Sequence, residues 1–169
     1  MPSIDRLLDE AAAGAPNAAP VVADPRFDPA LATAVVTCMD ARIDVFALLG
    51  LRIGDAHVLR NAGGVITQDT LRGLVISQRL MGTRTIVVVH HTGCGMTNRT
   101  EDVFREEIRR DTGMRPQWAG EFMARDREVE ELRQCFRRLR AEPLLPHGDD
   151  VRGYLYDMEA CELVRVRPE

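Results

Sequence analysis

Short apolar runs along the chain alternate with segments in which apolar residues recur every three to four positions. The runs at 33–39 and 84–90 are largely continuous, which is typical of strands buried on both faces of a parallel sheet. A shorter strand pattern lies between them, at 56–60, and two more lie later in the chain, at 152–157 and 162–166. The sequence therefore predicts five strands, the last two joined by a hairpin.

Helices are predicted before and between these strands. Apolar side chains in 126–140 lie three to four residues apart and give that segment one apolar face. Ser3, Thr67 or Asp69, and Thr100 are residues that accept hydrogen bonds from a first helical turn, so they indicate where three other helices begin. The predicted helices span 4–13, 44–49, 67–81, 100–110 and 126–140.

Strands that alternate with helices predict an α/β fold with a mainly parallel sheet and helices on both faces. We expect the strand order 2-1-3-4, with the fifth strand as a short extra edge strand. Open sheets of this kind bind ligands beyond the carboxyl ends of the strands, where the strand order reverses. The predicted position is therefore between the first and the third strand.

Two regions are expected along the chain. Residues 1–29 hold a short amphipathic helix and a connector rich in Ala and Pro, and such a helix is unstable alone. We expect it to pack on the body of the molecule or on a second subunit. Residues 30–169 are expected to form a single α/β domain.

Composition narrows the class of protein. With 169 residues, 45% of them hydrophobic, the chain suits one domain with a substantial core. The net charge of −4 comes without a basic stripe, so nucleic acid is not an expected partner. No apolar run approaches the roughly 18 residues of a membrane span, so no membrane association is expected. The first residues lack a signal-peptide pattern, so a cytoplasmic protein is expected.

Cysteine and histidine residues follow two of the predicted strands. Cys38 ends the first strand, and His91 and Cys94 follow the third. Because the carboxyl ends of these parallel strands meet at one edge, two thiols and one imidazole are expected to hold a zinc ion. Three protein ligands leave a fourth position for water or substrate, which is the arrangement of an enzyme. Taken singly, each residue also fits a packed core position.

His90 competes with His91 as the nitrogen ligand. Neighbouring side chains of a strand point to opposite faces, so only one of the two faces the metal. We favour His91 because its spacing to Cys94 suits a tight chelate, which leaves His90 as a packed histidine. Cys135 is expected in the core and Cys161 as a free thiol, and neither is expected to bind zinc.

Asp40 and Arg42 follow Cys38 closely. In an extended chain these side chains share a side with Cys38, and a bidentate pair with Arg42 keeps Asp40 ionised. The alternative is a solvated pair at the start of a helix, although Asp44 fits better as that helix cap.

A zinc ion with an open coordination position lowers the pKa of a bound water molecule to about 7, which gives hydroxide as a nucleophile at neutral pH. The loop residues Ala62, Gly63 and Gly64 have small side chains or none. They fit either one wall of a site for a small substrate or an ordinary turn.

These residues resemble the β-class carbonic anhydrases, most closely the short bacterial branch. The resemblance covers roughly 30–166 and is carried by three motifs. They are Cys38-Met39-Asp40-Ala41-Arg42, Arg60-Asn61-Ala62-Gly63-Gly64 and His91-Thr92-Gly93-Cys94-Gly95-Met96.

The resemblance implies one zinc ion per chain, bound by Cys38, His91 and Cys94, and a catalytic dyad of Asp40 and Arg42. It implies attack of a zinc-bound hydroxide on carbon dioxide to give bicarbonate, in a homodimer or homotetramer. In some relatives the aspartate becomes a fourth zinc ligand in a closed state, and we expect that Asp40 can do likewise.

Two alternatives remain at this point. The same branch includes carbonyl sulfide hydrolases, with the same ligands and dyad around a reshaped pocket. No glutamine lies in 21–37 to contact substrate, as one does in plant-type members, and Gly93 stands where close relatives often carry a polar residue. A structural zinc protein, with Asp40 as a permanent fourth ligand, is the third interpretation.

Overall fold

The structure is a computed structural model that describes residues 4–12, 28–97, 100–118 and 127–168. Its centre is a five-stranded sheet in the order β2-β1-β3-β4-β5. The first four strands are parallel, and β5 runs antiparallel to β4. The strands are β1 (Thr33–Cys38), β2 (Ala56–Asn61), β3 (Thr85–His91), β4 (Val151–Asp157) and β5 (Glu162–Val166). The predicted fold class and strand order are confirmed.

The helices lie close to their predicted positions. They are α1 (Ile4–Ala12), α2 (Val45–Leu49), α3 (Gln68–Leu80), α4 (Glu101–Thr112) and α5 (Glu128–Arg140), with short 3-10 turns η1 (Ala62–Gly64) and η2 (Gly95–Thr97). Thr67, rather than Asp69, caps α3 by accepting a hydrogen bond from the Thr70 N–H. Asp44 caps α2 in the same way. The predicted cap Ser3 and the predicted start at 126 lie outside the described residues.

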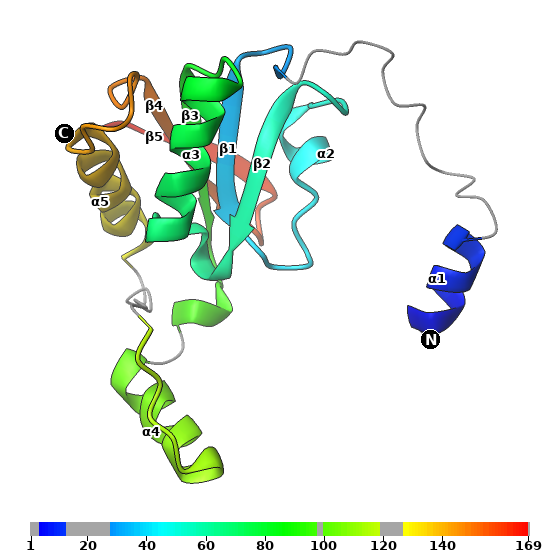
Figure 1. The fold of residues 1–169 in the computed structure, drawn as a ribbon, viewed down its shortest axis with the longest axis vertical. Coiled ribbons are helices and arrows are strands. Elements are labelled where there is room, and N and C mark those ends of the chain that lie inside the picture. The colour runs from blue at the N-terminus through cyan, green and yellow to red at the C-terminus, as the bar shows by residue number, and fades with distance from the viewer. Residues whose placement is uncertain (1–3, 13–27, 98–99, 119–126, 169) are drawn as a thin grey trace.

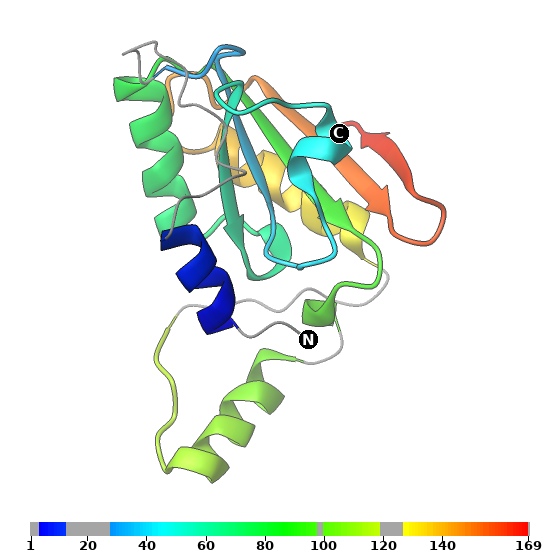
Figure 2. The ribbon, with the colours of Figure 1, turned by 90° about the vertical axis from the view of Figure 1, so that its right-hand side faces the viewer.

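The two faces of the sheet are covered unequally. Helices α3 and α5 cover one face, and the short α2 lies on the other (Figures 1 and 2). In β3, Ile86 and Val88 pack towards α3 and α5, whereas Val87 and Val89 face the side of α2. This alternation follows from the two-residue period of a strand. Residues next to each other in β3 therefore enter different environments.

The carboxyl ends of the three central strands lie level with each other. Cys38 pairs in register with Asn61 of β2, and Thr37 pairs with both Arg60 of β2 and Val89 of β3. The strand order reverses between β1 and β3, which is where ligands bind in open sheets. The residues that follow β1, β2 and β3 are therefore brought to one place.

Helices α1 and α4 lie away from the sheet. Figure 1 shows α1 beside the body and α4 extending below it. In α1, the side chains of Ile4 and Leu8 are 65% and 59% exposed. The division into an N-terminal segment and a zinc-enzyme domain, and the surface on which α1 packs, stay predictions. Within the described ranges, no helix is both long and apolar enough to cross a membrane.

Candidate metal centre

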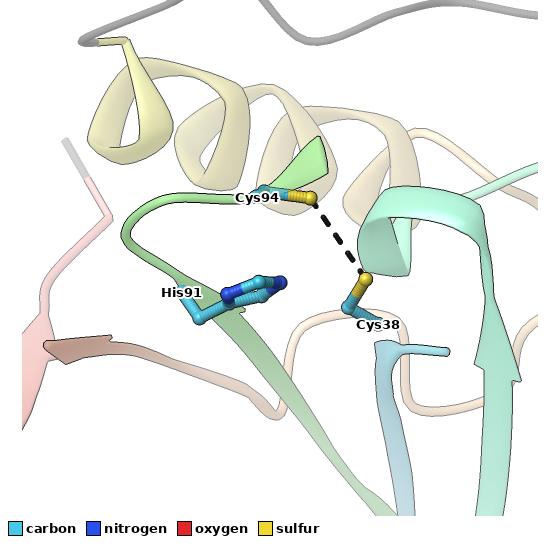
Figure 3. A group of neighbouring side chains, drawn as sticks. All are labelled: Cys38, His91 and Cys94. Carbon is cyan, nitrogen blue, oxygen red and sulfur yellow. Dashed lines mark hydrogen bonds between the residues drawn. The ribbon is translucent and has the colours of Figure 1, made fainter. Parts of the chain in front are cut away.

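Three side chains converge between the ends of β1 and β3, where the strand order reverses. Cys38 is the last residue of β1, His91 is the last residue of β3, and Cys94 lies three residues further on. Their ligand atoms lie within 4.8 Å of one another. The sulfurs face each other at 3.9 Å, with the imidazole directed towards the space beside them (Figure 3). Two sulfurs bound tetrahedrally at about 2.3 Å would lie about 3.8 Å apart, so the pair fits zinc.

The imidazole of His91 is oriented for metal binding. Its Nδ1 lies 3.0 Å from the Thr92 carbonyl oxygen, which only accepts, so Nδ1 carries the proton and donates. In the neutral ring the lone pair is then on Nε2, which is buried and makes no hydrogen bond to the described protein atoms. A carbonyl that fixes the tautomer in this way is typical of zinc-binding histidines. His91 therefore fits the site as a neutral ligand.

The pKa values of the Cys38 and Cys94 thiols are shifted in opposite directions. The Cys94 thiol hydrogen-bonds to Cys38 and lowers the pKa of Cys38 to about 4, and backbone N–H groups of Asp40 and Gly63 support that thiolate. The bond to Cys38 raises the pKa of Cys94 well above its ordinary value. Around neutral pH the pair holds one proton. A divalent cation that binds both sulfurs must displace it.

His90 points to the opposite face of the sheet. Strand β3 extends one residue further than predicted, to His91, so the two histidines alternate as strand residues do. The Nε2 atom of His90 lies 3.2 Å from the Gly64 carbonyl oxygen and 3.9 Å from the Cys135 sulfur. Burial lowers the pKa of His90, so it is neutral. It is the packed histidine that the sequence predicted.

Arg42 holds the carboxylate of Asp40 beside the three candidate ligand side chains. Its Nε and Nη2 donate to the two carboxylate oxygens at 2.9 and 2.6 Å. The same Nη2 donates to the Gly93 carbonyl oxygen at 3.1 Å. The Arg42 hydrogen bonds keep the pKa of Asp40 well below its usual range. Asp40 Oδ2 lies 3.9 Å from His91 Nε2, so an ionised carboxylate faces the metal position.

The predicted Asp40–Arg42 pair lies beyond the end of the strand. Residues 38, 40 and 42 share a side only in an extended chain, and β1 ends at Cys38, one residue before its predicted end. The following residues form a turn, in which the Ile43 N–H donates to the Asp40 carbonyl oxygen at 3.1 Å. The predicted pair therefore forms through a turn and not through strand alternation.

Glycines of η1 lie directly behind Cys38. Gly63 and Gly64 have φ values of 85° and 68°, in the left-handed region that favours glycine. A Cβ atom on Gly64 would lie 2.9 Å from the backbone N of Cys38 and 2.9 Å from the carbonyl carbon of Thr37. Sequence reasoning assigned Ala62–Gly64 to a substrate wall and missed this supporting role. The substrate wall itself stays a prediction.

Arg60 is a second residue whose contacts sequence reasoning missed. Its Nε donates to the Cys38 carbonyl oxygen at 2.9 Å, and its Nη2 donates to the Asp40 carbonyl oxygen at 2.7 Å. The available signal was the predicted parallel pairing, which sets the end of the second strand beside the end of the first.

Other titratable residues lie outside the centre. Cys135 is buried on the side of α5, and Cys161 is exposed in the turn after β4. His57 lies at the amino end of β2, where its Nδ1 is 2.8 Å from the Ser77 hydroxyl. Among the described residues, Cys38, His91 and Cys94 form the one group with a geometry that suits a metal ion.

Comparison with known proteins identifies relatives over most of the chain. The family model for carbonic anhydrase matches residues 33–143. β-Carbonic anhydrase 1 of Mycobacterium tuberculosis is 46% identical over 135 residues, which cover 80% of this chain and 82% of that protein. A carbon disulfide hydrolase of Acidithiobacillus thiooxidans is 31% identical over 150 residues, covering 76% and 74%.

Solved structures agree with these relationships. The crystal structure of a carbonic anhydrase from Streptococcus mutans matches with a TM-score of 0.86 and 35% identity, covering 99% of both chains. A carbonic anhydrase from Glaciozyma antarctica matches with a TM-score of 0.75 and 34% identity over 96% and 94%. This chain belongs to the carbonic anhydrase family, in its zinc-dependent β class.

Proposed function

We propose that this chain catalyses the reversible hydration of carbon dioxide to bicarbonate at the Cys38–His91–Cys94 centre. The observation that carries the proposal is the ionised Asp40 carboxylate, 3.9 Å from the ligand nitrogen of His91. In a structural zinc site Asp40 would be the permanent fourth ligand, whereas here both of its carboxylate oxygens accept hydrogen bonds from Arg42. The greater identity to an anhydrase, compared with the sulfur-substrate relative, supports carbon dioxide as the substrate.

The ligand set suits one zinc ion per chain. Two thiolates would balance the charge of a divalent cation, and all three ligand side chains are buried. When bound with an open position, zinc supplies a Lewis acid that makes water a nucleophile near neutral pH. The chain itself contributes the ligand geometry and the fixed tautomer of His91.

Asp40 would accept a hydrogen bond from the reacting water and orient it for attack. The low pKa that Arg42 imposes keeps Asp40 an acceptor at all moderate pH values. Arg42 would act as a positioning residue, because both carboxylate oxygens accept its hydrogen bonds. A closed state, with Asp40 as fourth ligand, would require breaking at least the bond to Oδ2.

Ala62, Gly63 and Gly64 would form the wall that the substrate passes. Gly63 and Gly64 are buried and carry no side chain, so the wall is made largely of backbone. Carbon dioxide is small and linear and requires little width. The wall would therefore exclude larger substrates by shape and contribute few polar contacts.

Stopped-flow carbon dioxide hydration, with zinc content recorded on each sample, tests this proposal. The zinc-loaded protein should turn over, and Asp40→Asn should lower kcat by about 10²-fold while zinc stays bound. Asp44→Asn is the matched control, because asparagine also caps a helix and Asp44 serves α2. Equal kcat values for the two variants would contradict the role of Asp40.

A second candidate is hydrolysis of carbonyl sulfide or a similar linear sulfur substrate. The specific observation in its favour is the family relationship to carbon disulfide hydrolases, at 31% identity. Carbonyl sulfide and carbon disulfide are linear like carbon dioxide and present the same electrophilic carbon. Sulfide release from both substrates, measured beside carbon dioxide hydration on one preparation, separates the candidates. A higher kcat/KM for either sulfur substrate would favour the hydrolase.

The active form is proposed to be a homodimer or homotetramer in which α1 packs on a second copy. Support comes from the exposed apolar side chains Ile4 and Leu8 on a nine-residue helix, which is too short to be stable alone. Light scattering after size exclusion tests this. Ile4→Ser with Leu8→Ser should lower the molar mass, whereas Leu80→Ser, at a leucine that is 76% exposed, should not. The cytoplasmic location stays a prediction.

A further inference from the structure

Two arginines of the site perform different tasks. Arg42 contacts the carboxylate of Asp40 through side-chain hydrogen bonds. Arg60 contacts no side chain in these bonds; its guanidinium donates to the backbone carbonyl oxygens of Cys38 and Asp40 at 2.9 and 2.7 Å. One arginine therefore orients the acid, and the other holds the segment of backbone that carries it.

The segment held by Arg60 lies just past the end of the sheet. Strand β1 ends at Cys38, and the Met39 N–H still donates to the Asn61 carbonyl oxygen at 2.8 Å. Beyond Met39 the chain leaves the sheet and turns at 40–43. The two hydrogen bonds of the Arg60 guanidinium, called the Arg60 fork below, join Cys38, the last residue of β1, to Asp40, the first residue of the turn. Because a guanidinium is planar and its donors are fixed, two such bonds restrict both peptide groups together.

The position of Arg60 follows from the strand register. Arg60 pairs with Thr37 in the parallel ladder, one residue before Cys38 pairs with Asn61. Its side chain extends over the carboxyl end of β1, on the rim of the metal centre, and is exposed. Substitution of Arg60 therefore removes the fork without leaving a buried cavity. The effect of the fork on the site can be measured separately from folding.

We propose that Arg60 is a positioning residue, which sets the distance between the Asp40 carboxylate and the metal by fixing the backbone from Cys38 to Asp40. It does not touch substrate or metal in this role. Without it, Asp40 and Arg42 remain paired but move together as the turn rotates about Met39. The Cys38 sulfur also loses part of its orientation, since its own carbonyl is released.

Arg60→Ala tests the proposal, with Arg79→Ala as the matched control. Arg79 is an exposed arginine whose Nε donates to the Leu144 carbonyl oxygen at 2.8 Å, so it makes the same kind of bond away from the centre. Supporting groups around a metal site typically contribute 10- to 100-fold in affinity or activity. We expect Arg60→Ala to lower kcat about 10- to 100-fold with little change in KM, and Arg79→Ala to leave kcat unchanged.

The expected change in kcat rests on the proposed function. Two other measurements do not depend on it. The visible absorption of the Co²⁺-loaded protein reports ligand geometry, and chelator competition reports zinc affinity. Both should change in Arg60→Ala and stay as in the parent in Arg79→Ala. If the parent lacks carbon dioxide hydration but these readouts change, the proposed function fails and the role of Arg60 stands.

Arg60→Lys distinguishes the fork from its charge. Lysine keeps the positive charge but cannot hold both carbonyls in a fixed plane, so it should recover only part of the loss seen in Arg60→Ala. Full recovery of kcat in Arg60→Lys would assign the effect to the positive charge and would overturn the proposal that the two fixed hydrogen bonds carry it. An unchanged cobalt spectrum together with kcat within about twofold of the parent in Arg60→Ala would overturn the proposal; if this variant does not fold, the same criterion applies to Arg60→Lys.

Discussion

The two faces of the sheet show how this chain separates stability from chemistry. One face is closed by two helices of 13 residues each, α3 and α5. The other is covered by the five-residue α2, and some of its apolar residues, such as Tyr154 and Leu163, are only partly buried. His90 and His91 lie on opposite sides of this boundary. Strand alternation alone assigns one histidine to the packed core and its neighbour to the metal.

The largest expected effect comes from cysteines on the two sides. Cys94→Ser removes a proposed metal ligand. We expect most of the zinc to be lost, and activity to fall with it by more than the roughly 100-fold typical of supporting residues. Cys135→Ala removes a buried thiol on the side of α5 and should keep zinc and activity. Metal analysis and carbon dioxide hydration on both variants check this. Zinc retained at full occupancy in Cys94→Ser would contradict the ligand assignment.

Truncation of the core on the helical face should cost the most stability. Phe136 of α5 is 1% exposed, and replacing it by Ala should lower the free energy of unfolding by about 3–5 kcal/mol. Leu163→Ala on the other face should cost less, because Leu163 is only partly buried. Urea denaturation of the two metal-free variants gives both values. Equal losses would mean that the two faces contribute alike.

Gly64 lies against the backbone of Cys38, and Gly113, which follows α4, provides a matched control. Both have a left-handed φ, 68° and 75°, but a Cβ atom would clash with Cys38 and Thr37 only at Gly64. Gly113→Ala should cost about 1 kcal/mol from backbone strain alone. Gly64→Ala should cost about 1–3 kcal/mol more and also weaken zinc binding. Thermal unfolding and chelator competition measure both effects; an unchanged zinc affinity in Gly64→Ala would separate the glycine from the site.

The last test changes the solution and not the sequence, and it concerns the pH dependence of zinc affinity. The pKa of Cys38 is lowered to about 4 by its bond to Cys94, and that of Cys94 is raised above its ordinary 9.0. Between these values the metal-free pair keeps one proton, which zinc must release. Affinity should therefore rise with pH, by about tenfold per unit from pH 5 to pH 8, or more steeply where His91 is protonated. An affinity independent of pH would contradict the shared proton.

The fold and the ligand set were accessible from the sequence because both depend on local pattern. Apolar runs gave the strands, and the ends of the first and third strands gave Cys38, His91 and Cys94, which the structure brings together. Arg60 was not assigned a role, and Gly64 was assigned to a substrate wall and not to the support of Cys38, because the contacts in question are with backbone atoms of another part of the chain. Such contacts depend on strand register and on the turn after Cys38, which residue types do not specify.

Zinc K-edge X-ray absorption of the metal-loaded protein reports which atoms bind the ion. We expect two sulfur ligands at about 2.3 Å, one imidazole nitrogen at about 2.0–2.1 Å and one further light atom. Fewer than two sulfurs in the first shell, or a shell unchanged in Cys94→Ser, would contradict this expectation.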